Sequence, residues 1–241
     1  MILPKLETTT YETTLPSTGK SITFRPYLVK EEKALLIAME TGDIKVITKN
    51  IMQLIGNCIV GDFDVNDLTL YDFEFVFLQL RSKSLGEEIN VTLKCARDGC
   101  DTEHDVIIPI EDIKFEYPKG EKTSNVVKLN DKLGVTLKHI PATILQTMSE
   151  NDITKLSPDA IQRLIRSAIV NIFDDNDVWD VKDVPTKELD EFIESMTAGQ
   201  LKKIQEYVSN QPSMVYEHEW KCSKCGYENK IVLKGMEAFL E

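Results

Sequence analysis

Short alternating segments at the start of the chain predict a β-hairpin followed by helices. Residues 11–15 and 22–25 alternate polar and apolar side chains around a Pro-Ser-Thr-Gly sequence, which favours a turn. Residues 28–40 are rich in Leu, Ala, Glu and Lys, and apolar residues recur at helical spacing through residues 43–60. We therefore expect one hairpin and then two helices in this part of the chain.

Residues 66–85 fit two kinds of element. Aromatic residues alternate at the centre of this segment as in a strand, whereas its apolar residues also recur as on one face of a helix. Asn66 and Asp67 could cap a helix, Gly86 could end it, and the segment contains neither Gly nor Pro. These features favour a helix whose aromatic side chains lie in the core.

Two further segments have the pattern of β-hairpins. Residues 88–94 and 104–108 alternate polar with apolar side chains on either side of a short turn. Residues 214–220 and 227–233 repeat this design near the end of the chain. We expect two similar hairpins that are far apart in sequence.

Between these hairpins the pattern indicates a strand pair and then helices. Residues 126–129 and 135–139 favour strands around an Asn-Asp-Lys-Leu-Gly turn. Each helix that follows has a recognisable start: Ser-Pro for the first, Pro-Thr for the second and a Thr-x-x-Gln capping box for the third. The expected helices span residues 159–173, 187–196 and 197–209.

Together these elements predict an α+β protein. Residues 1–86 should form an N-terminal hairpin with helices. Residues 87–140 and 211–241 should form a β domain in which the two similar hairpins make a split zinc ribbon. Residues 141–210 should form a helical insertion that leaves this domain and returns to it.

The turns of the two similar hairpins carry the chemistry that sets this sequence apart. Cys95 and Cys100 form a C-x4-C pair in the first turn, and Cys222 and Cys225 form a C-x2-C pair in the second. Four thiolates on two tight turns match the ligand set of a tetrahedral zinc ion. We expect one structural zinc per chain, held by these four cysteines.

Such a site would have no catalytic role, because four thiolates fill the coordination shell and leave no position for water. His104 and His218 are the candidates to replace a cysteine as zinc ligand. Both fall inside expected strands rather than in the turns, which favours ordinary surface histidines. The chain also lacks a Gly-x-Ser-x-Gly sequence, a His-Glu-x-x-His sequence and a phosphate-binding Gly-rich loop. These features predict a protein that is not an enzyme and has no small-molecule substrate.

The sequence offers few other candidates for a functional site. The fifth cysteine, Cys58, falls on the apolar face of an expected helix and should be a buried hydrophobic residue. The acidic run at residues 174–177 lacks the Gly and Glu of a calcium-binding EF-hand, so a solvated loop is favoured. Neither a signal peptide nor an apolar run long enough to span a membrane is expected.

The net charge is −12, which opposes general binding to a nucleic-acid backbone. Basic residues nevertheless surround the cysteine turns. An alternative function therefore stays open, in which a zinc ribbon binds nucleic acid or regulates transcription. The five basic residues are Lys94, Arg97, Lys221, Lys224 and Lys230.

Four stretches of the chain carry a resemblance to a known family: LPSTGK at 15–20, FRPYLVKEEKALL at 24–36, LRSKSLGE at 80–87 and WKCSKCG at 220–226. These stretches resemble the T4-type bacteriophage baseplate protein family. That family includes hub subunits and hub assembly proteins of contractile tails. The resemblance extends over nearly the whole chain and is clearest over residues 12–105 and 214–240.

The resemblance implies a non-enzymatic phage tail protein that acts in the baseplate hub, either as a structural subunit or in hub assembly. A further alternative is an assembly chaperone that is absent from the mature virion. The expected partners are other phage baseplate or tail proteins. The expected location is the host cytoplasm during assembly and, for a hub subunit, the tail baseplate of the virion.

Overall fold

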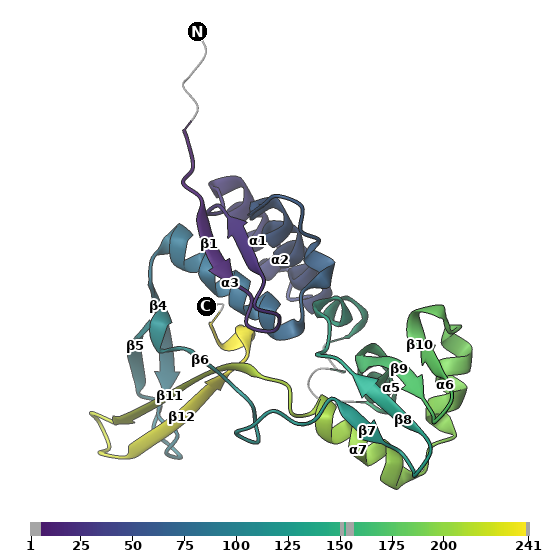
Figure 1. Cartoon of the computed structure of the whole chain (residues 1–241). Coiled ribbons are helices and arrows are strands. Elements are labelled where there is room, and N and C mark those ends of the chain that lie inside the picture. The colour runs from purple at the N-terminus through teal and green to yellow at the C-terminus, as the bar shows by residue number, and fades with distance from the viewer. Residues whose placement is uncertain (1–5, 150–151, 153–156, 240–241) are drawn as a thin grey trace.

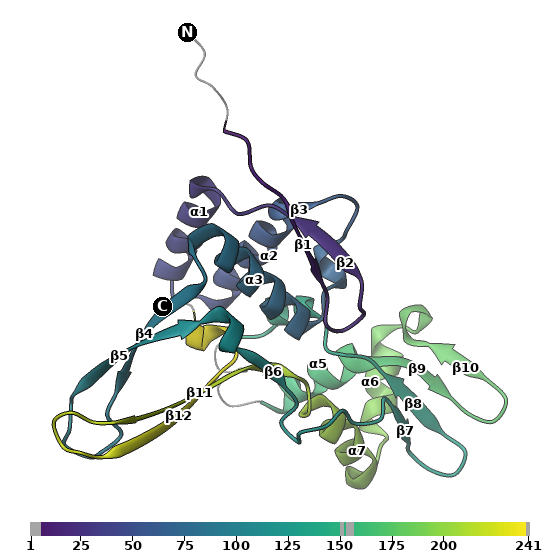
Figure 2. The ribbon, with the colours of Figure 1, turned by 60° about the vertical axis from the view of Figure 1, so that its left-hand side comes forward.

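The computed structural model describes residues 6–149, 152 and 157–239 of the 241-residue chain. It has the predicted α+β class, with helices and several small antiparallel sheets. Helices α1–α3 and a small sheet form one part, and two long hairpins extend from it (Figure 1). A second sheet with its own helices lies at the other end of the molecule, as a view turned by 60° also shows (Figure 2).

The N-terminal part begins with the expected hairpin, which gains a third strand from the end of a helix. Strands β1 and β2 pair around the turn, and β3 pairs with β2. The elements are β1 (Tyr11–Thr14), β2 (Ser21–Phe24), α1 (Val29–Glu40), α2 (Ile44–Cys58), β3 (Ile59–Val60), the 3-10 turn η1 (Val65–Asp67) and α3 (Leu70–Leu85).

The ambiguous aromatic segment is a helix, as predicted, but it starts later than expected. Leu68 is extended, and Thr69 caps α3 by accepting a hydrogen bond from the N–H of Asp72 at 3.2 Å. Asn66 and Asp67 instead belong to the 3-10 turn η1, which the Asp64 carboxylate caps. Buried aromatic residues of α3 such as Phe73 lie in the main core, so the aromatic stripe is core, as expected.

Two long hairpins follow the predicted pattern closely. The first consists of β4 (Glu88–Lys94) and β5 (Glu103–Pro109), and the second of β11 (Ser213–Lys221) and β12 (Glu228–Lys234). The short strand β6 (Lys114–Glu116) pairs with the start of β11. The 3-10 turns η2 (Ile110–Asp112) and η5 (Met236–Phe239) follow β5 and β12.

The segment between the hairpins forms a second body with its own core. Strands β7 to β10 make a sheet in the order β10-β9-β8-β7, and apolar side chains of its helices pack with that sheet. Its elements are β7 (Val126–Lys128), β8 (Gly134–Leu137), α5 (Pro158–Ala168), β9 (Ile169–Phe173), β10 (Val178–Asp180), η4 (Val181–Asp183), α6 (Thr186–Glu194) and α7 (Ala198–Val208). The 3-10 turn η3 (Ala142–Thr147) lies in the same segment and packs against α2 and α3 as well as α5.

The expected helix over residues 159–173 is wrong in its second part. Helix α5 ends at Ala168, and residues 169–173 form β9, which pairs with both β8 and β10. The β-branched sequence Ile-Val-Asn-Ile suits a strand, and neighbouring strands on both sides supply its backbone partners. The resulting sheet combines β7 and β8 with β9 and β10, and so takes strands from both sides of the expected boundary between residues 140 and 141.

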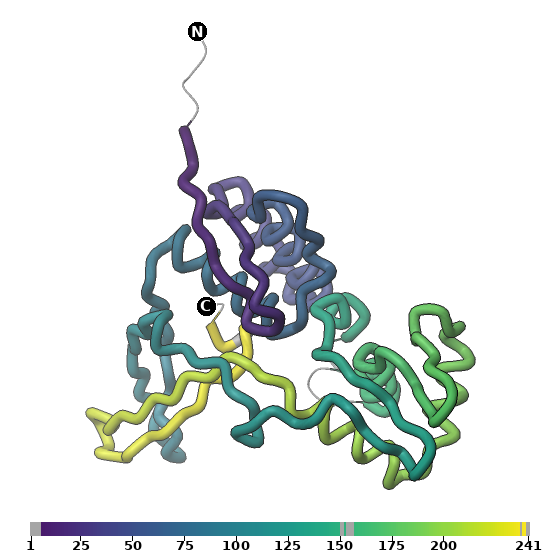
Figure 3. Tube along the Cα trace, in the orientation of Figure 1, coloured from purple at the N-terminus to yellow at the C-terminus, as the bar shows by residue number. Residues whose placement is uncertain are grey.

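The segment that leads into β7 and the segment that follows α7 connect this second body to the hairpins (Figure 3), and hydrogen bonds join the two segments. Buried Asn210 accepts a hydrogen bond from the N–H of Lys119 at 2.9 Å and donates one to the carbonyl of Glu121 at 2.8 Å. The neighbouring Gln211 side chain accepts from the N–H of Ile140 at 3.3 Å. The outgoing and returning segments are therefore joined to each other as well as to the sheet.

A buried ion pair joins the first sheet to α1. The guanidinium of Arg25 lies 2.9 Å from the carboxylate of Glu31, which also accepts the N–H of Leu28 at the start of the helix. Burial alone would raise the pKa of Glu31, but the hydrogen bonds from Arg25 and Leu28 lower it below its ordinary value. Glu31 is only 6% exposed, so its charge depends on Arg25.

We predict that Arg25→Ala lowers the free energy of unfolding by about 3 kcal/mol, because it leaves the buried Glu31 carboxylate without its cation. Urea unfolding at neutral pH measures the change. Lys30→Ala is the matched control, since Lys30 faces the same carboxylate at 3.6 Å but is 74% exposed. The control should cost less than about 1 kcal/mol. Equal losses in the two variants would contradict this account.

Candidate metal centre

The turns of the two long hairpins place their cysteines by the same means. In each turn a glycine adopts a positive φ, +76° at Gly99 and +70° at Gly226, which other residues rarely adopt. The N–H of Cys95 bonds the carbonyl of Thr102, and the N–H of Cys222 bonds the carbonyl of Tyr227, which closes each turn. The four thiols are thereby held at the tips of the hairpins.

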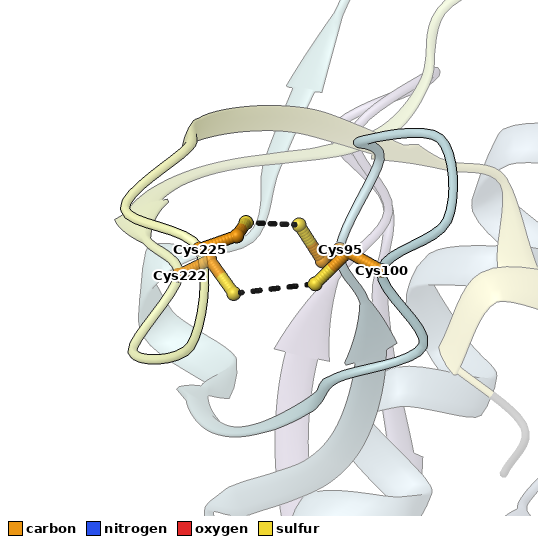
Figure 4. Close-up of side chains that lie close together, drawn as sticks. All are labelled: Cys95, Cys100, Cys222 and Cys225. Atoms are coloured by element: carbon orange, nitrogen blue, oxygen red, sulfur yellow. Dashed lines mark hydrogen bonds between the residues drawn. The ribbon is translucent and has the colours of Figure 1, made fainter.

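These two tips face each other, and their sulfur atoms converge (Figure 4). The Sγ atoms of Cys95 and Cys225 are 3.7 Å apart, and those of Cys100 and Cys222 are 3.8 Å apart. All four Sγ atoms lie within 4.8 Å of one another. Sulfurs bound to one tetrahedral zinc ion at 2.3 Å are about 3.8 Å apart, so the residues present fit a metal ion of this kind.

Local hydrogen bonds prepare some of these sulfurs to be anionic. The backbone N–H groups of Cys225 and Lys224 lower the pKa of the Cys222 thiol to about 6. The hydroxyl and N–H of Thr102 likewise lower the pKa of Cys100. At Cys225 the N–H of Tyr227 acts in the same direction, but burial and the neighbouring thiols raise the pKa to about 11. A single anionic charge among four close sulfurs opposes the ionisation of the others unless a cation is present.

Side chains outside the cysteine set join one turn to the other. Asn229 is 3% exposed, and its carbonyl oxygen accepts the N–H of Ala96 at 2.8 Å. The guanidinium of Arg97 donates to the carbonyl of Cys225 at 3.2 Å. Neither role was predicted from sequence. A polar residue among the inward-facing apolar positions of β12 is the feature that could have identified Asn229.

The structure thus brings together the four cysteines that the sequence singled out. They are the only group of three or more His, Cys, Asp or Glu side chains suited to one metal ion within the described residues. His104 and His218 lie in β5 and β11, outside this cluster, as expected. They are half-buried and face each other, however, and are not the ordinary surface histidines that we expected.

The other two candidates have structural roles. Cys58 is completely buried in the main core, as predicted, and burial raises the pKa of its thiol to about 11. The acidic run is a tight turn in which the Asp174 carboxylate accepts the N–H groups of Asn176 and Asp177, both at 2.8 Å. This confirms that residues 174–177 are a solvated loop.

Comparison with known proteins extends over both bodies of the structure. The family model described as T4 bacteriophage base plate protein matches residues 8–241. The chain belongs to this family. The match includes both cysteine turns and the sheet of β7 to β10, so the family's common unit contains the long hairpins and the inserted body together.

A curated relative is similar along most of its length. The baseplate hub assembly protein gp26 of Enterobacteria phage T4 is 23% identical over 238 residues, which cover 92% of this chain and 94% of the relative. No solved structure gives a significant match. None of the described helices is both long enough and apolar enough to cross a membrane.

We predict that Asn229→Ala lowers the free energy of unfolding by about 1–3 kcal/mol, because the N–H of Ala96 loses its acceptor in a buried place. Thermal or urea unfolding measures the loss. Asn90→Ala on the exposed face of β4 is the control and should change stability by less than about 0.5 kcal/mol. An Asn229→Ala variant as stable as the control would rule out this link between the turns.

Proposed function

We propose that this protein acts in building the baseplate hub of a contractile-tailed phage and is not an enzyme. The end-to-end match to a baseplate hub assembly protein is the observation that carries the proposal. Because the aligned region covers 92% of this chain and 94% of the relative, a shared role does not depend on one short motif. Its partners would be other baseplate proteins, met in the host cytoplasm during assembly.

The same proposal assigns one structural zinc ion to Cys95, Cys100, Cys222 and Cys225. The separations of 3.7 and 3.8 Å between sulfurs of opposite turns support it, as does the spread of the four ligands over two rigid hairpins. A closed four-thiolate shell would hold the hairpins together and offer no open position for a substrate. The ion would therefore contribute to shape, and the surfaces of the protein would contact the partners.

The zinc-ribbon regulator is not favoured as an alternative. Around the cysteine turns, Lys230 already has carboxylate partners, with Glu219 at 2.9 Å and Glu217 at 3.5 Å. The whole chain has a charge of −12, which opposes binding to a phosphate backbone. These charges suit contact with proteins better than contact with nucleic acid.

We predict about one zinc per chain in protein purified without chelator, measured by elemental analysis. Cys222→Ser removes one thiolate and should lower the zinc content well below one per chain, with a large loss of stability. Cys58→Ala is the matched control, because this cysteine lies in the core away from the cluster, and it should retain the full zinc content. Zinc-free wild-type protein, or full zinc content in Cys222→Ser, would contradict the assignment.

We also predict that a phage lacking this gene makes few complete baseplates and regains its titre when the wild-type protein is supplied from a plasmid. Electron microscopy of lysates would show the missing hubs, and plaque counts would measure the rescue. Cys222→Ser should rescue poorly and Cys58→Ala fully. Normal baseplates in the absence of the protein would contradict a role in hub building.

Mass spectrometry of purified particles separates the two forms of this role. A structural subunit remains in the mature tail at a fixed ratio to other baseplate proteins. An assembly factor is present in infected-cell lysates and absent from particles. The name of the T4 relative refers to hub assembly and fits either form, so the presence or absence of the protein in mature particles decides between them.

A further inference from the structure

A pair of histidines lies between the two long hairpins, at some distance from the cysteine turns. His104 of β5 and His218 of β11 bring their Nε2 atoms to 3.4 Å from each other. Their ring centroids are 5.6 Å apart, so the rings meet through their nitrogen-bearing edges rather than through their faces. The planes differ by only 19°, and the two Nε2 atoms face each other.

Strand geometry explains why these two side chains meet. His104 is four residues after Cys100, and His218 is four residues before Cys222. Since successive side chains on a strand alternate between faces, His218 points to the same side of its hairpin as Cys222. The partner of His104 across the first hairpin is Leu93, whose buried side chain also faces the second hairpin. The interface that closes at the sulfurs therefore also contains both imidazoles.

We propose that His104 and His218 form a second metal site, which takes one zinc ion between their Nε2 atoms. Two nitrogens bound to one tetrahedral zinc at about 2.1 Å lie about 3.4 Å apart, which equals the separation seen here. Imidazole is a common ligand for zinc and for similar divalent transition metals. Water molecules would complete the shell, because both residues are only half-buried.

The surroundings favour ordered rings and a neutral His218. Trp220 lies nearly parallel to both rings, with centroids 5.2 Å from His104 and 5.6 Å from His218, which restricts their rotation. Burial and the neighbouring His104 lower the pKa of His218, so this ring is unprotonated at neutral pH. A hydrogen bond between the two Nε2 atoms requires one ring to carry its hydrogen on Nε2. When zinc binds at both Nε2 atoms, that ring would change tautomer and carry its hydrogen on Nδ1, as the other ring already does.

The consequence of this site is a second connection between the hairpins. Each histidine is four residues from a cysteine of its own hairpin, and four residues along a strand span about 13 Å. The two ions would therefore bind at separate positions along the same interface. The cysteine cluster would join the tips and the histidine pair would join the middle. Zinc bound at the histidines would then oppose the sliding or opening of one hairpin against the other.

The test is a titration of zinc into protein that already contains one equivalent of zinc. Isothermal titration calorimetry measures the binding. We expect one further equivalent for the wild-type protein and its loss in His218→Phe and His104→Asn. The phenylalanine variant keeps an aromatic ring against Trp220, so it separates lost coordination from lost packing. Elemental analysis after dialysis should find the first equivalent unchanged in both variants, which keeps this result independent of the cysteine site.

Nitrogen-15 spectra of the imidazoles identify the atoms that bind. The Nε2 chemical shifts of His104 and His218 should change when zinc is added. Those of His139 should not change, because His139 lies in another part of the protein, where it forms a hydrogen bond with Gln211. Three results would overturn the proposal: no second equivalent in the wild type, a second equivalent that persists in both variants, or binding that leaves the two Nε2 signals unmoved.

Discussion

The closure of the two cysteine turns against each other is the constraint on which the rest of the structure depends. Cys100 and Cys222 are 122 positions apart, and closing a loop of that length costs about 4 kcal/mol in chain entropy beyond a constant term. Structural zinc in small peptides contributes about 10–16 kcal/mol, so the proposed ion would outweigh this cost. Without a cation, four sulfurs within 4.8 Å of one another would have only weak thiol contacts to hold them together. The cluster is thus where the fold of the distant segments is decided.

The interface between the two long hairpins is apolar at its base, aromatic in its middle and made of cysteine sulfurs at its tip. Near the base of the hairpins, fully buried Ile89 and Ile108 face the second hairpin, where Met214 is buried in the same core. The middle holds the histidine pair with Trp220, and the tip holds the sulfurs. Apolar burial stabilises the base, where the helices exclude water. The tip lies beyond the reach of this core, and small exposed ribbons there need another source of stability. Directional bonds from Asn229, and the proposed metal ion, supply it.

Sequence patterns predicted the local elements well and the distant pairing poorly. Both long hairpins, the aromatic helix and the four converging cysteines were expected, because strand alternation, helix caps and ligand spacing are all local features. The errors came where tertiary partners decide. Residues 169–173 continue an apolar spacing that a helix also satisfies, and only the presence of β8 and β10 on either side makes them a strand. The histidine pair was missed because each imidazole was judged within its own strand. Leu93 and His104 face a second hairpin only because the two cysteine turns meet, and the sequence of one hairpin does not contain that information.

The inserted body is attached to the rest of the protein at more than one place. Asn210 and Gln211 join the outgoing and returning segments, and Ile140 and Ala142 form backbone hydrogen bonds with Leu70 and Leu68. The returning segment continues directly into β11, which carries His218 and leads to Cys222. Strand β11 therefore connects the hairpin interface to the base of the insertion, and it also contacts α3, because the N–H of Met214 donates a hydrogen bond to Glu74. The family match over residues 8–241 includes the two bodies and the strand between them. With the proposed zinc ion bound, the hairpins would be held against each other, so the placement of β11 at the base of the inserted body would be restricted as well.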